Sequence, residues 1–221
     1  MIVAIDGPAG SGKSTTAKAV ADKLGMMFLD TGAMYRAVAL SILRENVDLR
    51  NIESVKTLLN GTKIELSRNN SGLKVTLNGE DITDKIRTQE INAIVSEVSE
   101  VPAVREFLVP QQRIFAEGRD IVAEGRDLGT VVFPDAEVKV FLVASEDERA
   151  RRRMKELRQK GAVVDVEGVL DSIKKRDRID STREHSPLKK AEDAIEIDTT
   201  KLRFEEQVEK IVDIVKQKTV V

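Results

Sequence analysis

The sequence lacks the residues and segments that are typical of secreted and membrane proteins. Its 221 residues include no cysteine, no tryptophan, one tyrosine and one histidine. Without cysteine the chain has no disulfide and no thiolate nucleophile. No apolar run approaches the roughly 20 residues that cross a bilayer. The N-terminus also lacks a basic segment followed by an apolar one. We therefore expect a cytoplasmic protein that does not enter a membrane.

A strong charge of either sign is also missing. The 36 basic residues nearly balance the 38 acidic ones, which leaves a net charge of −2. Such a chain has no general attraction to nucleic acid, so we expect no nucleic-acid partner, and any anion site must be local. Apolar residues make up 41% of the chain and aromatics only 3%. A core of Ala, Val, Ile and Leu suits a parallel sheet covered by helices.

The apolar pattern alternates strands with helices along most of the chain. Strands are predicted at Ile2–Asp6, Met27–Leu29, Ile121–Glu124, Val138–Val143 and Ala194–Ile197. Helices are predicted at 13–24, 33–46, 52–59, 88–98, 103–116, 146–160 and 166–180, and a last one carries an apolar stripe of Phe204, Val208, Ile211, Val212 and Val215. This alternation predicts an α/β fold with a doubly wound parallel five-stranded sheet.

Residues 62–82 follow a different pattern. Apolar and polar residues alternate there, as in half-exposed strands. Asn69-Asn70-Ser71-Gly72 and Asn78-Gly79 are turn signals, and the second is among the strongest for a hairpin. We predict a small antiparallel β unit inserted into the alternating chain.

A glycine-rich segment lies between the first predicted strand and the first predicted helix. Its spacing, Gly7-x-x-x-x-Gly12-Lys13-Ser14, is that of a phosphate-binding loop. Glycines let N–H groups face phosphate oxygens, and the helix N-terminus adds a partial positive charge. Lys13 is predicted to contact the β- and γ-phosphates and Ser14 to ligate Mg²⁺. The predicted ATP-binding residues are Gly7, Pro8, Ala9, Gly10, Ser11, Gly12, Lys13, Ser14 and Thr15.

A phosphate loop serves GTPases, motors and small-molecule kinases alike. The guanine-reading pattern Asn/Thr-Lys-x-Asp is absent, because neither Thr62-Lys63 nor Thr200-Lys201 continues it. A small-molecule kinase needs a second, arginine-containing site for its acceptor. Two segments that follow predicted strands offer one: "LDTGAMYRA" from Leu29 and "AEGRDLGTVVFPDA" from Ala123. Ligands of doubly wound sheets bind where strands end, which favours the kinase.

With these segments the sequence resembles the bacterial cytidylate (CMP) kinases, P-loop nucleoside monophosphate kinases, over nearly its whole length. The resemblance is carried by "IDGPAGSGKST", "LDTGAMYRA", "GEDITDKIRTQEI", "VPAVREFL", "AEGRDLGTVVFPDAEVKVFLVAS", "ERARRRMKEL" and "IKKRDRIDSTRE". It implies transfer of the γ-phosphate of ATP to CMP or dCMP, with Mg²⁺, in pyrimidine nucleotide metabolism. It implies one P-loop kinase domain, 1–221, in a chain that we expect to be monomeric. The core covers about 1–30, 117–147 and 181–221, the nucleoside-monophosphate region with the β insert about 31–116, and a helical lid about 148–180.

The resemblance also implies residue roles. Arg36 and Arg126 match residues that hold the acceptor phosphate. Residues that read cytosine are matched by Thr31, Arg105, Asp127 and Arg183, residues near the ribose by Arg176 and Asp180, and a further pocket residue by Ser96. Thr31 replaces the serine of some relatives. Tyr35 either lines the pocket or packs beneath it. Independently, an aspartate can accept from cytosine N4 and an arginine can donate to N3 and O2, whereas uracil reverses positions 3 and 4. CMP is therefore expected to exceed UMP as a substrate.

Three assignments remain less specific. "ERARRRMKELRQKG" is expected to be a mobile lid with a catalytic arginine, Arg153 first and then Arg149 or Arg158, although a solvated helix face or a nucleic-acid patch would also be arginine-rich. Glu124 is expected to hold Mg²⁺ through water. "AEGRD" occurs at 116–120 and 123–127, and the second copy is assigned the function. The catalytic set is then Lys13, Arg126 and Arg153. The alternatives are a kinase for UMP, another nucleoside monophosphate or shikimate, a nucleotide-dependent binding module, and an RNA-binding protein.

Overall fold

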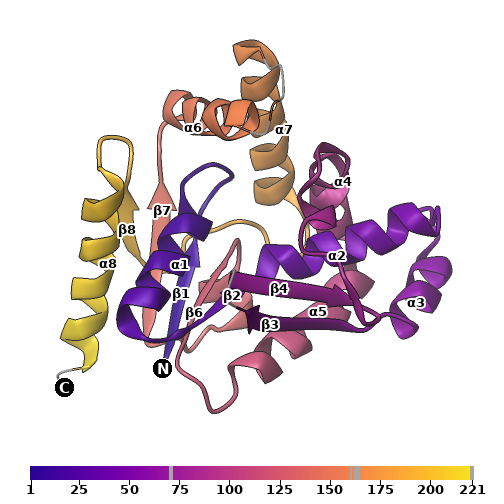
Figure 1. Cartoon of the computed structure of the whole chain (residues 1–221), viewed down its shortest axis with the longest axis horizontal. Coiled ribbons are helices and arrows are strands. Elements are labelled where there is room, and N and C mark those ends of the chain that lie inside the picture. Colours follow the sequence, from indigo (N-terminus) through magenta and orange to yellow (C-terminus); the bar gives the residue numbers. More distant parts are fainter. Residues whose placement is uncertain (70–71, 160, 162–164, 220–221) are drawn as a thin grey trace. The chain divides into compact units, whose positions relative to one another are not determined.

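The computed structural model of the chain describes residues 1–69, 72–159, 161 and 165–219 (Figure 1). These residues form two compact units. The core unit consists of Met1–Leu29 and Gly118–Val221, and the inserted unit of Asp30–Glu117. The predicted boundaries of the core, the nucleoside-monophosphate region and the lid stay predictions.

The core unit is built on a parallel five-stranded sheet, as predicted. Its strands are β1 (Ile2–Asp6), β2 (Met27–Asp30), β6 (Ile121–Gly125), β7 (Val138–Val143) and β8 (Ile195–Asp198), in the order β2-β6-β1-β7-β8. In this sheet β1 is central and pairs in parallel with β6 and β7, so that Val3 lies opposite Val122 and Val138. The connection from β1 runs toward one edge and that from β6 toward the other. The carboxyl end of β1, where Gly7 follows, is therefore the switch point at which such sheets bind ligands.

Two helices cover one face of this sheet. They are α1 (Lys13–Leu24) and α8 (Phe204–Thr219), which pack against each other (Figure 1). Alternate strand residues such as Val3 and Ile5 meet Val20 of α1 and Ile211 of α8 in one apolar cluster. The predicted stripe of α8 is confirmed at Val208, Ile211, Val212 and Val215 but is wrong at Phe204, which is 46% exposed at the first residue of the helix.

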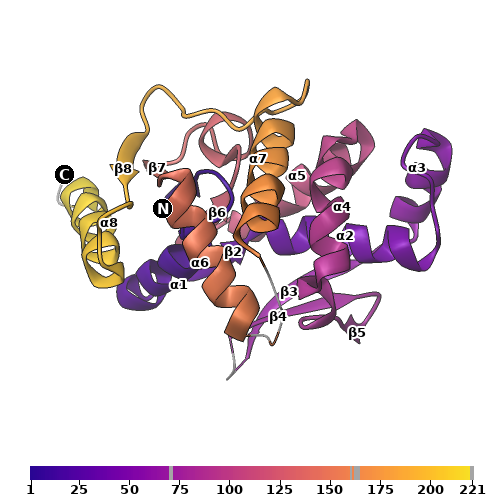
Figure 2. The same cartoon turned by 90° about the horizontal axis from the view of Figure 1, so that it is seen from above.

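The core unit also contains the helix pair of the predicted lid, α6 (Glu146–Gln159) and α7 (Val166–Thr182) (Figure 2). They pack on each other through a small apolar cluster of Ala150, Val169 and Ile173. Most other residues of α6 are charged, so polar contacts must hold the rest of it in place. No helix in the described ranges combines the length and the apolar character needed to span a bilayer.

The inserted unit combines helices with a small antiparallel sheet. Its elements are α2 (Thr31–Arg44), α3 (Ile52–Asn60), β3 (Ile64–Asn69), β4 (Gly72–Leu77), β5 (Glu80–Asp81), a 3₁₀ turn η1 (Lys85–Arg87), α4 (Gln89–Glu100) and α5 (Pro102–Ala116). The sheet order β3-β4-β5 confirms the predicted β insert. Asn78 and Gly79 have positive φ values of 50° and 83°, as a two-residue hairpin turn requires. The central residues of the other predicted turn, 70 and 71, lie outside the described residues.

Two glycines of the core unit give a matched test of this geometry. Gly7 has a φ of 150°, and a Cβ there would lie 2.2 Å from the carbonyl oxygen of Leu142 in β7. Gly25 caps α1 with a φ of 68°, and a Cβ there would meet nothing within 4 Å. We expect Gly7→Ala to lower the free energy of unfolding by about 3 kcal/mol or more, because backbone must move. Gly25→Ala should lower it by only about 1 kcal/mol. Urea unfolding measures both, and equal losses would contradict the close approach of Gly7 to β7.

Candidate active site

The phosphate loop joins β1 to α1 in the core unit, and its polar groups are oriented by several elements. Gly12 caps α1 with a φ of 92°, and its carbonyl accepts hydrogen bonds from the hydroxyls of Thr15 and Thr16 at 2.9 and 2.8 Å. The Nζ of Lys13 donates to the carbonyl of Pro8 at 3.0 Å. The predicted strand–loop–helix context of the loop is therefore confirmed.

The charge of Lys13 is crowded by other cations. Lys13 is only 5% exposed, and burial lowers its pKa from 10.5 to about 7. The positive charges of Arg126 and Arg176 lower that pKa further, while Glu124 and Asp180 oppose them. A phosphate bound in the loop would supply the missing negative charge.

An oxygen pair beside Lys13 suits Mg²⁺. The Oγ of Ser14 donates to Oε1 of Glu124 at 2.7 Å, and Glu124 is buried at the end of β6. Hydroxyl and carboxylate oxygens are the hard ligands that Mg²⁺ prefers, and nucleotide sites commonly use one or two of them plus water and phosphate. This donor set fits the ion. Over the described part of the chain no cluster of three His, Cys, Asp or Glu residues could hold a metal by itself.

Two predicted arginines of the core unit share one carboxylate. The Nε of Arg126 donates to Asp180 Oδ2 at 2.8 Å, and the Nε of Arg176 lies 4.0 Å from the same oxygen. Burial raises the pKa of Asp180, but the two guanidinium groups outweigh it and hold that pKa below its ordinary value. Asp180 therefore stays ionised and fixes Arg126 next to the lysine of the loop.

The predicted cytosine-reading carboxylate is also held in place. Arg183 NH2 lies 3.4 Å from Asp127 Oδ1, and both residues are buried. The chain after Asp127 is fixed by a residue that the sequence did not reveal, Asp6. Its two carboxylate oxygens accept the backbone N–H groups of Leu128 and Gly129 at 2.9 and 2.8 Å. A buried acid that ends a strand just before a glycine loop is the one signal that could have drawn attention to Asp6.

The inserted unit contributes a second arginine site at the start of α2. Asp30 caps this helix by accepting the N–H of Ala33 at 2.8 Å. Its Oδ1 lies 3.6 Å from NH1 of Arg36, which is buried and has no hydrogen-bond partner in the part of the chain that the structure covers. Arg36 thus forms only a loose ion pair with Asp30, and its NH1 group can still donate a hydrogen bond to an anion.

The same unit holds the other two predicted base-reading residues, Thr31 and Arg105, and the predicted pocket residues Tyr35 and Ser96. The guanidinium carbon of Arg105 lies 5.6 Å from the centre of the Tyr35 ring, a cation–π distance. Tyr35 and Thr31 are buried on α2. Ser96 is buried on α4, and its hydroxyl has no hydrogen-bond partner within residues 1–69, 72–159, 161 and 165–219. A polar ligand would satisfy it.

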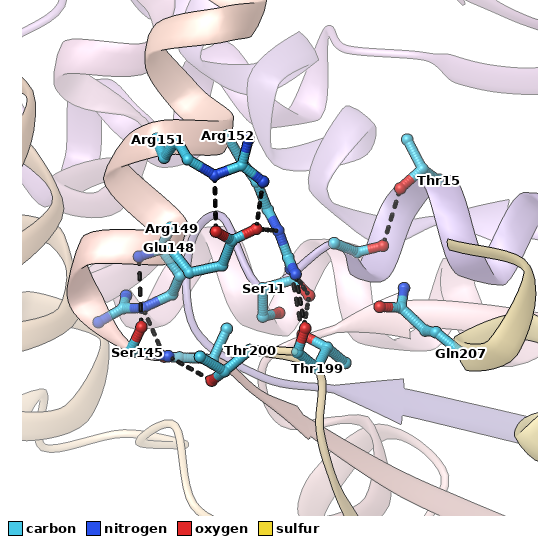
Figure 3. A network of polar contacts seen from close by, with 12 residues as sticks. Ser11, Thr15, Ser145, Glu148, Arg149, Arg151, Arg152, Thr199, Thr200 and Gln207 are labelled. Atoms are coloured by element: carbon cyan, nitrogen blue, oxygen red, sulfur yellow. Dashed lines mark hydrogen bonds and ion pairs between the residues drawn. The ribbon is translucent and has the colours of Figure 1, made fainter. Parts of the chain in front are cut away.

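The arginines of α6 fall into distinct environments. Arg149 is 5% exposed and donates to the carbonyl oxygens of Ala9 and Ala144 and to the carboxylate of Asp177. Arg153, the predicted catalytic arginine, donates to Glu156 at 2.7 Å. Arg158 is exposed. The nearby Arg152, which was not among the predicted site residues, reaches the phosphate loop (Figure 3).

Comparison with known proteins adds one consistent finding. The family model described as cytidylate kinase matches residues 3–217. The chain is 51% identical to the cytidylate kinase of Carboxydothermus hydrogenoformans over 99% of this chain and 98% of that protein. It is 50% identical to the cytidylate kinase of Bacillus subtilis over 98% of this chain and 97% of that protein.

The pKa of Lys13 predicts a proton balance. Near pH 8 the free protein has a largely neutral Lys13, because the pKa is about 7. Bound phosphates raise that pKa, so we expect binding of a nucleoside triphosphate at pH 8 to take up close to one proton. Titration calorimetry in two buffers of different ionisation enthalpy measures the uptake.

The control is Lys13→Arg, since a guanidinium does not deprotonate in this range. It should abolish the uptake even where it weakens binding. Uptake that persists in this variant would assign the proton to another group.

Proposed function

Because the chain belongs to the cytidylate kinase family, we infer that it transfers the γ-phosphoryl group of ATP to CMP or dCMP and releases ADP with CDP or dCDP. The observation that carries the inference in the structure is the cation cluster of the core unit. The charges of Arg126 and Arg176 lower the pKa of Lys13 in the phosphate loop, and Asp180 holds these arginines in place. A donor phosphate and an acceptor phosphate both need such cations.

The chemistry requires little from side chains beyond position and charge. An oxygen of the acceptor phosphate forms a bond to the γ-phosphorus, and the bond from that phosphorus to the β,γ-bridging oxygen breaks, so that ADP leaves with the electron pair. The acceptor is already anionic, and no general base is needed. Rate enhancement then comes from alignment and from neutralising the charge that spreads over the transferred group.

On the donor side, residues 7–15 bind the triphosphate of ATP and Lys13 bridges its β- and γ-phosphates. Mg²⁺, when bound, neutralises charge on these phosphates. Ser14 and Glu124 would hold it, Glu124 through water. Arg153 is the proposed lid arginine, because it is held by a partly exposed ion pair with Glu156, 28% and 47% exposed, and such pairs contribute little stability.

On the acceptor side, Arg36 and Arg126 bind the phosphate of CMP, and Arg176 and Asp180 lie near its ribose. Asp127 accepts the N4 amino group of cytosine, while Arg105 donates to N3 and O2. Thr31 and Arg183 complete the proposed base contacts, and Ser96 is a further residue of the acceptor pocket. Among the described residues, the hydroxyl of Ser96 and NH1 of Arg36 are buried without a hydrogen-bond partner, which supports this assignment.

A kinase for another acceptor is the alternative, and an acceptor panel decides between them. Purified protein with Mg-ATP is assayed for ADP release with CMP, dCMP, UMP, AMP, GMP or shikimate. We expect CMP and dCMP to give the highest kcat/KM. A higher value for UMP or shikimate would reject the proposal, and ADP release that is independent of every acceptor would indicate a nucleotide-dependent binding module.

Asp127 should control the choice between cytosine and uracil. An Asn side chain can donate to O4 of uracil, so we expect Asp127→Asn to lower the ratio of kcat/KM for CMP to that for UMP by about tenfold or more. Asp120→Asn is the matched control, because Asp120 ends the other "AEGRD" copy and pairs with the N-terminal amino group. It should leave the ratio unchanged, and an equal effect of both variants would contradict the assignment.

Glu124 should determine the Mg²⁺ requirement. Glu124→Gln keeps an oxygen for the hydroxyl of Ser14 but removes the negative charge. We expect the Mg²⁺ concentration at half-maximal activity to rise by about tenfold, with the KM for CMP nearly unchanged. A titration of Mg²⁺ at fixed ATP measures it. An unchanged Mg²⁺ requirement with a reduced kcat would place the metal elsewhere.

A further inference from the structure

The side chain of Arg152 links three parts of the core unit. It leaves α6, passes Glu148 and ends between the phosphate loop and the segment after β8 (Figure 3). Its Nε donates to Glu148 at 2.8 Å, its NH1 to the carbonyl of Ser11 at 3.1 Å, and its NH2 to the carbonyl of Thr199 at 2.7 Å. NH1 also donates to the hydroxyl of Thr199 at 3.1 Å. Four of its five N–H groups are therefore used.

These contacts make Arg152 unsuited to follow a phosphate during the reaction. To reach the transferred group, it would have to break several charge-assisted hydrogen bonds at once. Its neighbour Arg151 differs in this respect. Arg151 shares the carboxylate of Glu148 through two hydrogen bonds of 2.7 Å, but it is 68% exposed and, within the described part of the chain, donates to no other residue. The two arginines thus share one anchor and differ in their reach to the loop.

The Ser11 carbonyl is the informative contact. In a planar trans peptide, the C=O of one residue and the N–H of the next point in opposite directions. A donor that holds the Ser11 carbonyl on the outer side of the loop therefore turns the N–H of Gly12 toward its inner side, where phosphates bind. NH1 of Arg152 also lies close to this peptide, since a Cβ on Gly12 would be only 3.4 Å from it.

Thr199, in the segment after β8, contacts the same peptide. It is fully buried directly after β8, and its N–H donates to the carbonyl of Val143 at the end of β7 at 2.8 Å. Its hydroxyl lies 3.3 Å from the Ser11 carbonyl and 3.0 Å from that of Val143. Arg152 and Thr199 thus hold one carbonyl of the loop against the ends of β7 and β8.

We propose that Arg152 is a positioning residue of the donor site, which orients the Ser11–Gly12 peptide toward the phosphates and ties it to Thr199. The proposal rests on the proposed function only in that the loop binds a nucleotide phosphate. Arg152 acts through the backbone and touches neither substrate. Its loss should therefore weaken donor binding and leave acceptor binding unaffected.

The test is titration calorimetry of the full chain with Mg-ADP and no acceptor, followed by steady-state kinetics. We expect Arg152→Ala to raise the Kd for Mg-ADP and the KM for ATP by about tenfold or more, with the KM for CMP within about twofold of the unchanged chain. Arg152→Lys can still donate to one carbonyl and should give an intermediate Kd. Arg151→Ala, the matched control, should change the Kd for Mg-ADP and the KM for ATP by no more than about twofold.

Thr199→Val provides a second route, which holds if Arg152→Ala does not fold. It removes the hydroxyl but keeps the carbonyl that Arg152 binds. We expect a smaller rise in the Kd for Mg-ADP, and less than additive effects when it is combined with Arg152→Lys, because both act on one peptide.

Three results would overturn the proposal. The first is a Kd for Mg-ADP in folded Arg152→Ala that stays within about twofold of the value for the unsubstituted protein or, if this variant does not fold, the same result in both Arg152→Lys and Thr199→Val. The second is an equal weakening of Mg-ADP binding by Arg151→Ala. The third is an equal rise in the KM values for ATP and CMP. If the unchanged chain binds Mg-ADP but does not phosphorylate CMP, the proposed function fails, and the binding comparison still decides the role of Arg152.

Discussion

The orientation of the peptide groups between Gly7 and Gly12 is the constraint on which the core unit depends. Their N–H groups can face an anion only if the intervening carbonyls find partners on the other side. Those partners come from two helices: Lys13 and the hydroxyls of α1 bind the carbonyls of Pro8 and Gly12, and Arg149 and Arg152 of α6 bind those of Ala9 and Ser11. A buried carbonyl without a partner costs about 1–3 kcal/mol, so these contacts select one loop conformation. Two of these partners lie on the helix α6, which has few apolar residues and so depends on polar contacts of this kind.

The core unit also holds several positive charges close together in a buried site, which is unfavourable in the free protein. Burial and the nearby charges of Arg126 and Arg176 lower the pKa of Lys13, and Glu124 and Asp180 compensate only in part. Sites that must bind polyanions commonly hold such strain in the free protein, where it lowers stability and is relieved by the ligand. Asp180 limits the strain by staying ionised between the two arginines. The cations are thus fixed before a phosphate arrives, and little reorganisation is left for the moment of transfer.

The local features of this structure could be predicted from the sequence, and the long-range side-chain contacts could not. The five strands, the phosphate loop and the Asn78-Gly79 hairpin follow from residues that are close in sequence. The strands are predicted by apolar periodicity, the loop by glycine spacing and the hairpin by its turn residues. Arg152 and Asp6 bind backbone groups far along the chain, and a peptide carbonyl or N–H leaves no mark on the sequence that would identify its partner. Among the clustered arginines of α6, position on the helix alone did not distinguish one that holds the loop from one that is exposed. The prediction that Phe204 faces the core was wrong for a related reason, because the apolar periodicity continues beyond the point where the end of the helix leaves the core.

Asp6 connects the phosphate loop to the loop that carries Asp127. It ends β1 on one side of Gly7, and its carboxylate holds the N–H groups of Leu128 and Gly129. Burial raises the pKa of Asp6 to about 7, while these two N–H donors favour the ionised form. The carboxyl group ionises at its ordinary pKa of 3.8 in the unfolded chain but only near 7 in the folded one. The free energy of unfolding therefore falls as the pH rises from 3.8 toward 7. Part of the stability from apolar burial is therefore spent on a fixed carboxylate at the strand end. In return, the segment after Asp127 keeps one conformation, which a carboxylate that distinguishes an amino group from a carbonyl requires.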